Sequence, residues 1–210
     1  SSDLVAVFNT PGANANAVKE LVIAGMLLAS RDIIGGVEWC RANADDENIG
    51  KSAEKAKKQF AGTEITGKTL GVIGLGAIGK LVAQAAEALG MKVVGYDPYS
   101  SAEKAAAISP NLVYVESLDD LYPVADFVTI HVPATPDTKG MVNAEAFAQM
   151  KDDVVLLNFA RDTLVDDAAL AEAMEAGKVR AYVTDFANPA VMQLPRAIVI
   201  PHLGASTAEA

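Results

Sequence analysis

The chain has 210 residues, of which 51% are hydrophobic and 21% charged, so it is long enough to bury the core of one large domain. Its net charge of −10 argues against nucleic acid or an anionic membrane as a partner, because proteins bind both through clustered Lys and Arg. The single cysteine, Cys40, excludes an internal disulfide framework and predicts a reducing, cytoplasmic location.

The first part of the chain predicts a strand, a long helix and a charged segment. Asp3 to Phe8 is a short apolar run, which Thr10-Pro11-Gly12 ends. Residues 15–31 are typical of a helix that is apolar on nearly every side, which indicates a core helix and a subunit interface about equally. Its longest apolar run, 21–29, is too short to span a bilayer, so no membrane segment is predicted. Residues 43–58 are highly charged, as expected for a solvent-exposed helical arm or loop.

From residue 69 onward, strand and helix patterns alternate. We expect strands near 69–73, 92–96, 126–130, 153–158, 179–184 and 197–200. We expect helices near 77–89, 101–107, 117–122, 143–150 and 166–176. This alternation predicts an α/β fold with a doubly wound parallel sheet of the Rossmann type, whose ligand crevice lies at the carboxyl ends of the strands.

A glycine-rich segment joins the first strand of this alternation to its first helix. Gly74 permits a tight turn, Gly76 lets the backbone approach a pyrophosphate, and Gly79 lets the helix pack closely on the sheet. The amides of Ala77 and Ile78 open the helix, whose positive end faces the phosphates. Glycine-rich turns are common, so the motif alone is a weak signal. Here strand, turn, helix and second strand stand in the order that a dinucleotide site requires.

Asp97 ends the second strand of the alternation, where a carboxylate can accept hydrogen bonds from both ribose hydroxyls and repel a 2′-phosphate. This position favours NAD over NADP as the cofactor. Each of the later polar residues near strand ends has a structural explanation when taken alone, but together with Asp97 they outline one crevice: His131, Arg161, Asp185 and His202. No metal site is predicted.

Segments along nearly the whole chain resemble the D-2-hydroxyacid dehydrogenase family, most closely its members that act on D-3-phosphoglycerate. These segments stand in one order, which makes the resemblance specific: Asn9-Thr10-Pro11-Gly12, Tyr96-Asp97-Pro98, His131-Val132-Pro133, Asn158-Phe159-Ala160-Arg161, Thr184-Asp185-Phe186 and Pro201-His202-Leu203-Gly204. The resemblance implies an oxidoreductase that transfers a hydride between NAD and C2 of a D-2-hydroxy acid, at the entry to serine synthesis. A glyoxylate or hydroxypyruvate reductase with the same residues is the alternative.

The resemblance also implies roles for individual residues. It assigns Arg161 to the substrate carboxylate and carbonyl, and His202 to proton exchange with the C2 hydroxyl. These types suit the roles, because Arg offers a planar fork to a carboxylate and His has an ordinary pKa near neutrality. Around NAD, with Asp185 near the nicotinamide carboxamide, it places Gly74, Gly76, Ala77, Ile78, Gly79, Asp97, Val132, Pro133, Thr138, Phe159, Ala160, Arg161, Asp185, His202 and Gly204.

Two positions depart from the family pattern. Asn188 stands in place of a Glu that hydrogen-bonds the catalytic His, and a neutral amide can orient that ring but cannot stabilise an imidazolium as a carboxylate does. Glu209 is an alternative carboxylate, although Ser206 to Glu209 favours a helix capping box. Asp162 stands where Gly is usual and adds a negative charge beside Arg161, which concerns the substrate rather than NAD.

Family members carry a second domain, built from residues before the Asn9 region and after the Pro-His-Leu-Gly segment, that closes over the substrate. The chain begins and ends near these crossing points, so we expect residues 1–210 to be the NAD-binding domain alone, with little turnover of its own. The alternative functions that involve no catalysis are an NAD sensor and a dimerisation unit. Arg161 and His202 argue against a pure sensor, whereas a homodimer through helix 15–31 is expected beside catalysis.

Overall fold

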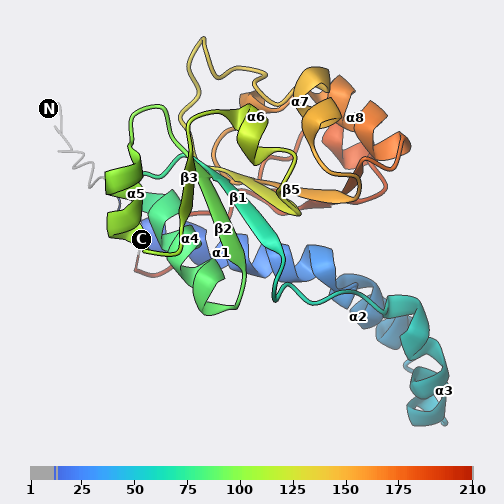
Figure 1. The fold of residues 1–210 in the computed structure, drawn as a ribbon. Helices are drawn as coiled ribbons and strands as arrows, with labels where there is room; N and C mark the ends of the chain where they lie inside the picture. Colours follow the sequence, from blue (N-terminus) through green and yellow to red (C-terminus); the bar gives the residue numbers. More distant parts are fainter. Residues whose placement is uncertain (1–11, 13, 210) are drawn as a thin grey trace, which may run out of the picture.

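The computed structural model describes residues 12 and 14–209. Its elements form three layers, in which a central sheet lies between two layers of helices (Figure 1). Seven parallel strands have the order β3-β2-β1-β4-β5-β6-β7. They are β1 (Thr69–Ile73), β2 (Lys92–Tyr96), β3 (Val113–Val115), β4 (Phe127–Ile130), β5 (Val154–Asn158), β6 (Val179–Thr184) and β7 (Ala197–Val199). The predicted doubly wound parallel sheet is therefore confirmed. The strand expected at Asp3 to Phe8 lies outside the described residues.

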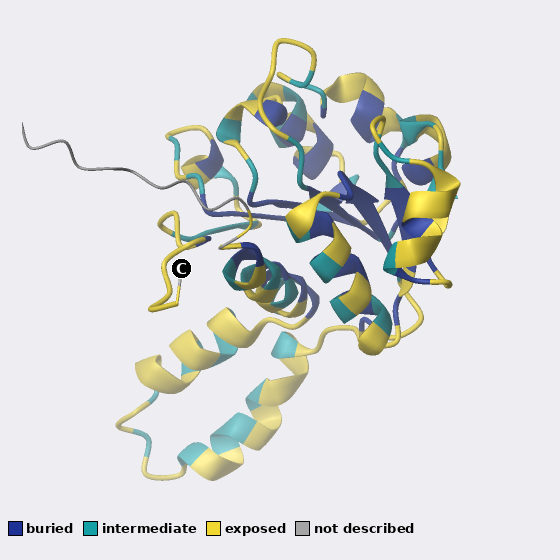
Figure 2. Cartoon of the chain, turned by 90° about the vertical axis from the view of Figure 1, so that its left-hand side faces the viewer, coloured by how far each residue is buried: buried dark blue, intermediate teal, exposed yellow. Residues whose placement is uncertain are grey.

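Helices cover both faces of the sheet. One face carries α1 (Ala15–Ser30), α4 (Ala77–Ala88) and α5 (Ala102–Ile108), and the other carries α6 (Leu118–Leu121), α7 (Ala144–Gln149) and α8 (Asp167–Glu175). Along β5, Val154 and Leu156 join the core on the α7 and α8 side, whereas Val155 and Leu157 join the core on the α1 side. The strands are consequently apolar on both sides, and Figure 2 shows the sheet as a buried layer.

Helix α1 is a core helix on one of its sides. Val22 and Met26 are fully buried, and the helix packs against α4, β5 and β6. Leu27, on another side, is 40% exposed. The core interpretation of this helix is confirmed, and the interface interpretation remains a prediction for its exposed side. None of the helices in residues 14–209 combines the length and hydropathy needed to cross a bilayer.

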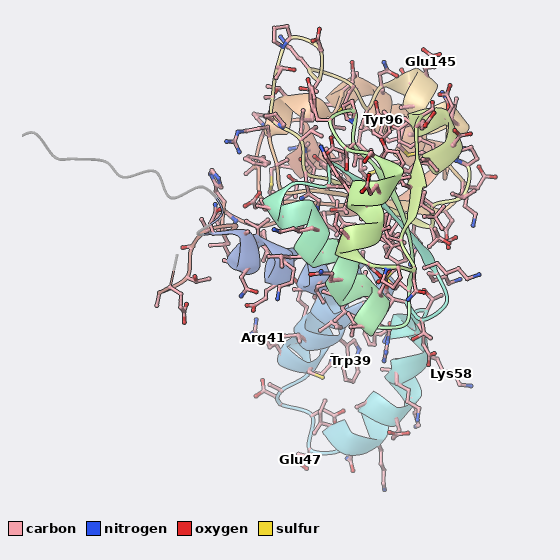
Figure 3. All side chains as sticks on the ribbon, turned by 60° about the vertical axis from the view of Figure 1, so that its left-hand side comes forward. Trp39, Arg41, Glu47, Lys58, Tyr96 and Glu145 are labelled. Atoms are coloured by element: carbon pink, nitrogen blue, oxygen red, sulfur yellow. The ribbon has the colours of Figure 1, made fainter. Side chains whose placement is uncertain are left out.

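Residues 33–60 leave the sheet domain as an arm (Figures 1 and 2). It consists of α2 (Ile33–Ala42), α3 (Ile49–Ala56) and the 3-10 helix η1 (Lys57–Phe60). Trp39, labelled in Figure 3, packs edge-on against Phe60 with ring centroids 6.4 Å apart, which joins the two halves of the arm. Every residue of α2 and α3 is exposed or half-buried, as expected for the charged segment. The pattern did not predict α2.

The strand order reverses between β1 and β4 at the centre of the sheet. From β1 the chain continues outward to β2 and β3, and then returns to β4 on the other side. The loops that follow β1 and β4 therefore diverge, and a crevice opens at the carboxyl ends of these strands. The backbone N–H of Gly74 donates to the Tyr96 carbonyl and that of His131 to the Ile73 carbonyl, each at 2.7 Å. These bonds fix where both loops start.

Candidate active site

The glycine-rich loop has the geometry that its sequence predicts. Gly74 has φ +94°, and a Cβ there would lie 2.6 Å from the His131 carbonyl oxygen. A Cβ on Gly79 would overlap the Gly74 carbonyl, so the close approach of α4 to the loop needs glycine. A Cβ on Gly76 would meet no atom within 4 Å, which leaves open space at the start of α4. A phosphate group at that helix end would fill this space.

Asp97 faces the same loop from the end of β2. Its Oδ2 accepts the Leu75 N–H at 2.9 Å and its Oδ1 accepts the Tyr99 N–H at 2.8 Å. Asp97 is half-buried, so part of it remains exposed to solvent. The loop and the acid are thus brought together as a dinucleotide site requires.

A cavity of about 230 Å³ lies at the carboxyl ends of the central strands, and it collects most of the predicted site. Its lining includes Ile78, Val132, Pro133, Phe159, Ala160, Arg161, Asp185, His202 and Gly204. Asn14, Val18 and Ala205 also line it, and none of the three was among the predicted site residues. A larger cavity of about 510 Å³ lies at the opposite, amino ends of the strands, beside Lys92 and Val113, away from the phosphate loop.

Thr138 lies in a turn and not in the lining of this cavity. Its hydroxyl donates to the Pro133 carbonyl at 2.7 Å and accepts the Thr135 N–H at 2.8 Å. These bonds give Thr138 a structural role in the loop that carries Val132 and Pro133. Its contact with the cofactor remains a prediction.

Asp185 is 2% exposed and lines the cavity. Its Oδ2 accepts the Gly204 N–H at 2.9 Å, whereas its Oδ1 is buried without a hydrogen-bond partner among the described residues. Burial raises the pKa of the Asp185 carboxyl. A buried acceptor without a donor fits an amide N–H supplied by a ligand, such as the carboxamide of a nicotinamide. This oxygen of Asp185, the open space beside Gly76 and the carboxylate of Asp97 together fit NAD.

The two histidines of the cavity differ in burial. The Nε2 of His131 lies 2.9 Å from the Thr129 hydroxyl, and burial lowers the pKa of His131 from 6.5 to about 3. His131 is therefore neutral near pH 7 and is unsuited to carry a proton. His202 is exposed, has φ +45°, and packs its ring against Phe186 at a centroid distance of 5.1 Å. The accessible histidine is the one suited to proton exchange.

Arg161 is exposed at the end of β5, and its Nη1 donates to the Ala160 carbonyl at 2.6 Å. The buried Asn158 holds the backbone beside it by donating from Nδ2 to the Arg161 carbonyl at 2.9 Å. The remaining guanidinium donors are accessible from the cavity, so they can bind a carboxylate.

The structure corrects the expectation that Asn188 orients His202. The Nδ2 of Asn188 donates to Oδ1 of Asp162 at 3.1 Å and to Oδ2 of Asp167 at 3.0 Å. Both of its N–H groups are used by these carboxylates, which would otherwise repel one another. Glu209 lies in an exposed turn, so it is not a buried partner of the ring.

Two glycine variants distinguish a role in the stability of the fold from a role in binding the ligand. In Gly76→Ala we expect an unchanged thermal unfolding temperature but NAD affinity at least about tenfold lower, because the methyl group enters the phosphate space. In Gly79→Ala we expect a loss of about 1–3 kcal/mol of stability through overlap with Gly74. Calorimetric unfolding and NAD titration measure both. Wild-type NAD affinity in Gly76→Ala would show that the phosphate space is elsewhere.

Known proteins share this sequence and fold. Residues 23–204 match the family described as D-isomer specific 2-hydroxyacid dehydrogenase, NAD binding domain. The D-3-phosphoglycerate dehydrogenases of Mycobacterium tuberculosis and Methanocaldococcus jannaschii are 45% and 41% identical over 98% of the chain. The chain spans 38% of the length of each of these relatives.

A solved structure shares the fold. The crystal structure of a glyoxylate reductase from Paecilomyes thermophila matches 94% of this chain and 58% of its own, with a TM-score of 0.79 and 29% identity. The family match extends over most of the chain and includes the phosphate loop, Asp97, Arg161 and His202. The chain therefore belongs to the D-isomer specific 2-hydroxyacid dehydrogenases and is an NAD-binding domain of that family.

Proposed function

We propose that the protein containing this chain is an NAD-dependent D-3-phosphoglycerate dehydrogenase at the entry to serine synthesis, with residues 1–210 as its cofactor domain. The observation that carries the proposal is one cavity lined by an accessible His202, an accessible Arg161 and the unpartnered buried oxygen of Asp185. The names of the relatives at 45% and 41% identity support the substrate. A cytoplasmic location remains a prediction from the single cysteine.

In this proposal the residues of the chain hold the substrate and move its proton. NAD, when bound, supplies the hydride acceptor for oxidation and the hydride donor for reduction. Arg161 binds the substrate carboxylate and stabilises the carbonyl that develops at C2. His202 takes the proton of the C2 hydroxyl while the C2 hydrogen leaves with both electrons of its bond. In the reverse direction His202 returns that proton to the oxygen.

The cofactor contacts follow the crevice in this proposal. The amides of Ala77 and Ile78 bind the pyrophosphate beside Gly76, and Asp97 accepts the ribose hydroxyls. The remaining contacts come from the cavity and its bordering loop: Val132, Pro133, Thr138, Phe159, Ala160, Arg161, Asp185, His202 and Gly204.

A glyoxylate or hydroxypyruvate reductase is the second candidate, and the structural match to a glyoxylate reductase favours it. It would use the same Arg161 and His202, so only the substrate differs. A non-catalytic NAD sensor is the candidate of another class, and the accessible His202 argues against it, because a sensor has no need of a proton carrier.

Turnover by the full-length protein tests the proposal. With NAD and D-3-phosphoglycerate we expect NADH formation. His202→Asn should lower kcat by about 10²–10⁴-fold and NAD affinity much less, because His202 is only one of many cofactor contacts. Arg161→Lys should mainly raise KM for the acid, because the planar fork is lost. Arg41→Lys, in the exposed arm, is the control.

Other outcomes of this experiment support an alternative function or contradict the role of His202. NAD binding without NADH formation from any D-2-hydroxy acid supports the sensor. Turnover with glyoxylate or hydroxypyruvate but not with 3-phosphoglycerate supports the reductase. Full activity in His202→Asn contradicts the role of His202 in both enzymes.

We also propose that the chain forms a homodimer through the exposed side of α1 and the adjoining α2. Leu27, Ile33, Ile34 and Val37 are 40%, 48%, 43% and 43% exposed, although all are large and apolar. They follow one another along the end of α1 and the start of α2. An exposed apolar group of this kind favours a protein partner.

Light scattering of the purified chain measures this association. We expect a mass of twice the 21.8 kDa of the chain. In Ile34→Glu the mass should shift toward that of the monomer, because a buried unpaired carboxylate opposes association. Val124→Glu changes another exposed apolar residue, outside α1 and α2, and should leave the dimer intact. A wild-type chain that stays at the single mass at all concentrations would contradict the dimer.

A further inference from the structure

The segment Phe186–Asn188, which follows β6 and Asp185, touches both halves of the proposed substrate site. Phe186 packs against the ring of His202, with the two rings tilted by 54°. Two residues later, Asn188 hydrogen-bonds Asp162, the neighbour of Arg161 in the chain. One short segment thus connects the loop that bears Arg161 to the histidine.

The side chain of Asn188 is held at three points. It donates to Asp162 at 3.1 Å and to Asp167 at 3.0 Å, and its Oδ1 accepts the Val191 N–H at 2.9 Å. An amide has two N–H donors, and here each serves a different carboxylate. Asn188, Asp162 and Asp167 are all half-buried, so water screens their interactions only in part.

The two carboxylates need this shared donor. Burial of Asp167, followed by the nearby charge of Asp162, raises the pKa of the Asp167 carboxyl, and the hydrogen bond from Asn188 opposes that rise. Hydrogen bonds to charged acceptors are stronger than those between neutral groups. Without the amide, repulsion would drive Asp162 away from Asp167, and Asp162 directly follows Arg161.

A second link holds the other side of Arg161. Asn158, which is fully buried, donates to the Arg161 carbonyl at 2.9 Å and to the Tyr182 hydroxyl at 3.3 Å. The Thr184 hydroxyl donates to the Asn158 carbonyl at 2.9 Å, so β5 and β6 are tied at this point. The backbone of Arg161 is therefore fixed between Asn158 on one side and Asp162 on the other.

We propose that Asn188 is a positioning residue that, through its hydrogen bonds to Asp162 and Asp167, fixes Arg161 toward the substrate. The same short segment contacts His202 through Phe186. This inference rests on the proposed dehydrogenase function. It makes Asp162 and Asn188 a coupled pair and not two separate departures from the family pattern. A Glu at position 188 would place three carboxylates together, so the amide and the aspartate require each other.

A double-mutant cycle in the full-length enzyme tests the coupling. We expect Asp162→Ala and Asn188→Ala each to lower kcat/KM for the hydroxy acid by about tenfold or more, mainly through KM, because Arg161 is misplaced. The double variant should lose no more than the larger single loss, since both changes break one link. NAD affinity should stay within about twofold in all three. Asn111→Ala, an exposed asparagine at the amino ends of the strands, is the matched control.

Losses that multiply in the double variant, or that fall equally on NAD affinity, would overturn the inference while leaving the dehydrogenase function in place. Asp162→Asn replaces Asp162→Ala if that variant does not fold. The side-chain amide signals of Asn188 in ¹H–¹⁵N spectra of the chain report the link without turnover. They should shift in Asp162→Asn, and unchanged signals would overturn the link. A wild-type enzyme that binds NAD but makes no NADH overturns the proposed function instead.

Discussion

The carboxylate of Asp97 accepts the backbone N–H of Leu75 at 2.9 Å, and this bond ties the end of β2 to the phosphate loop after β1. The Gly74 N–H, which donates to the Tyr96 carbonyl, adds a second tie between the same two segments. The loop is thereby held where α4 begins, with open space beside Gly76. The remainder of the proposed site depends on this anchor, because a cofactor held at this end is oriented toward the cavity beyond it.

The polar residues at the other end of the crevice differ in burial, and therefore in the chemistry that they can perform. His131 is half-buried and its lowered pKa keeps it neutral near pH 7, whereas His202 is exposed and lines the cavity. Asp185 is buried with one oxygen bound to the Gly204 N–H and the other without a described partner, so the second oxygen is an acceptor that a ligand can use. Environment, rather than residue type alone, therefore determines which polar residue is suited to carry a proton.

The sequence predicted most of the sheet because its strands are apolar on both sides and alternate with amphipathic helices. It missed β3, whose three residues at the edge of the sheet are too few to show a period, and α2, which has no buried face. Most of the predicted site residues share one cavity because residues at the carboxyl ends of parallel strands converge.

Side-chain partners that are distant in the chain could not be predicted in the same way. The bond between Asn188 and Asp162 joins residues 26 positions apart, and neither residue type indicates it. The family pattern instead suggested a contact with His202. Thr138 shows the same limit, because its hydroxyl is used within its own turn. Local periodicity determines which residues share an edge of the sheet, whereas the choice of hydrogen-bond partner depends on the packed loops.

Calorimetric titration of the chain with NAD and NADP, run in parallel, tests the anchor most directly. We expect NAD to bind and NADP to bind at least about tenfold more weakly, because the Asp97 carboxylate accepts ribose hydroxyls and repels a 2′-phosphate. Equal affinity for the two, or no binding of NAD by the folded chain, would contradict the account.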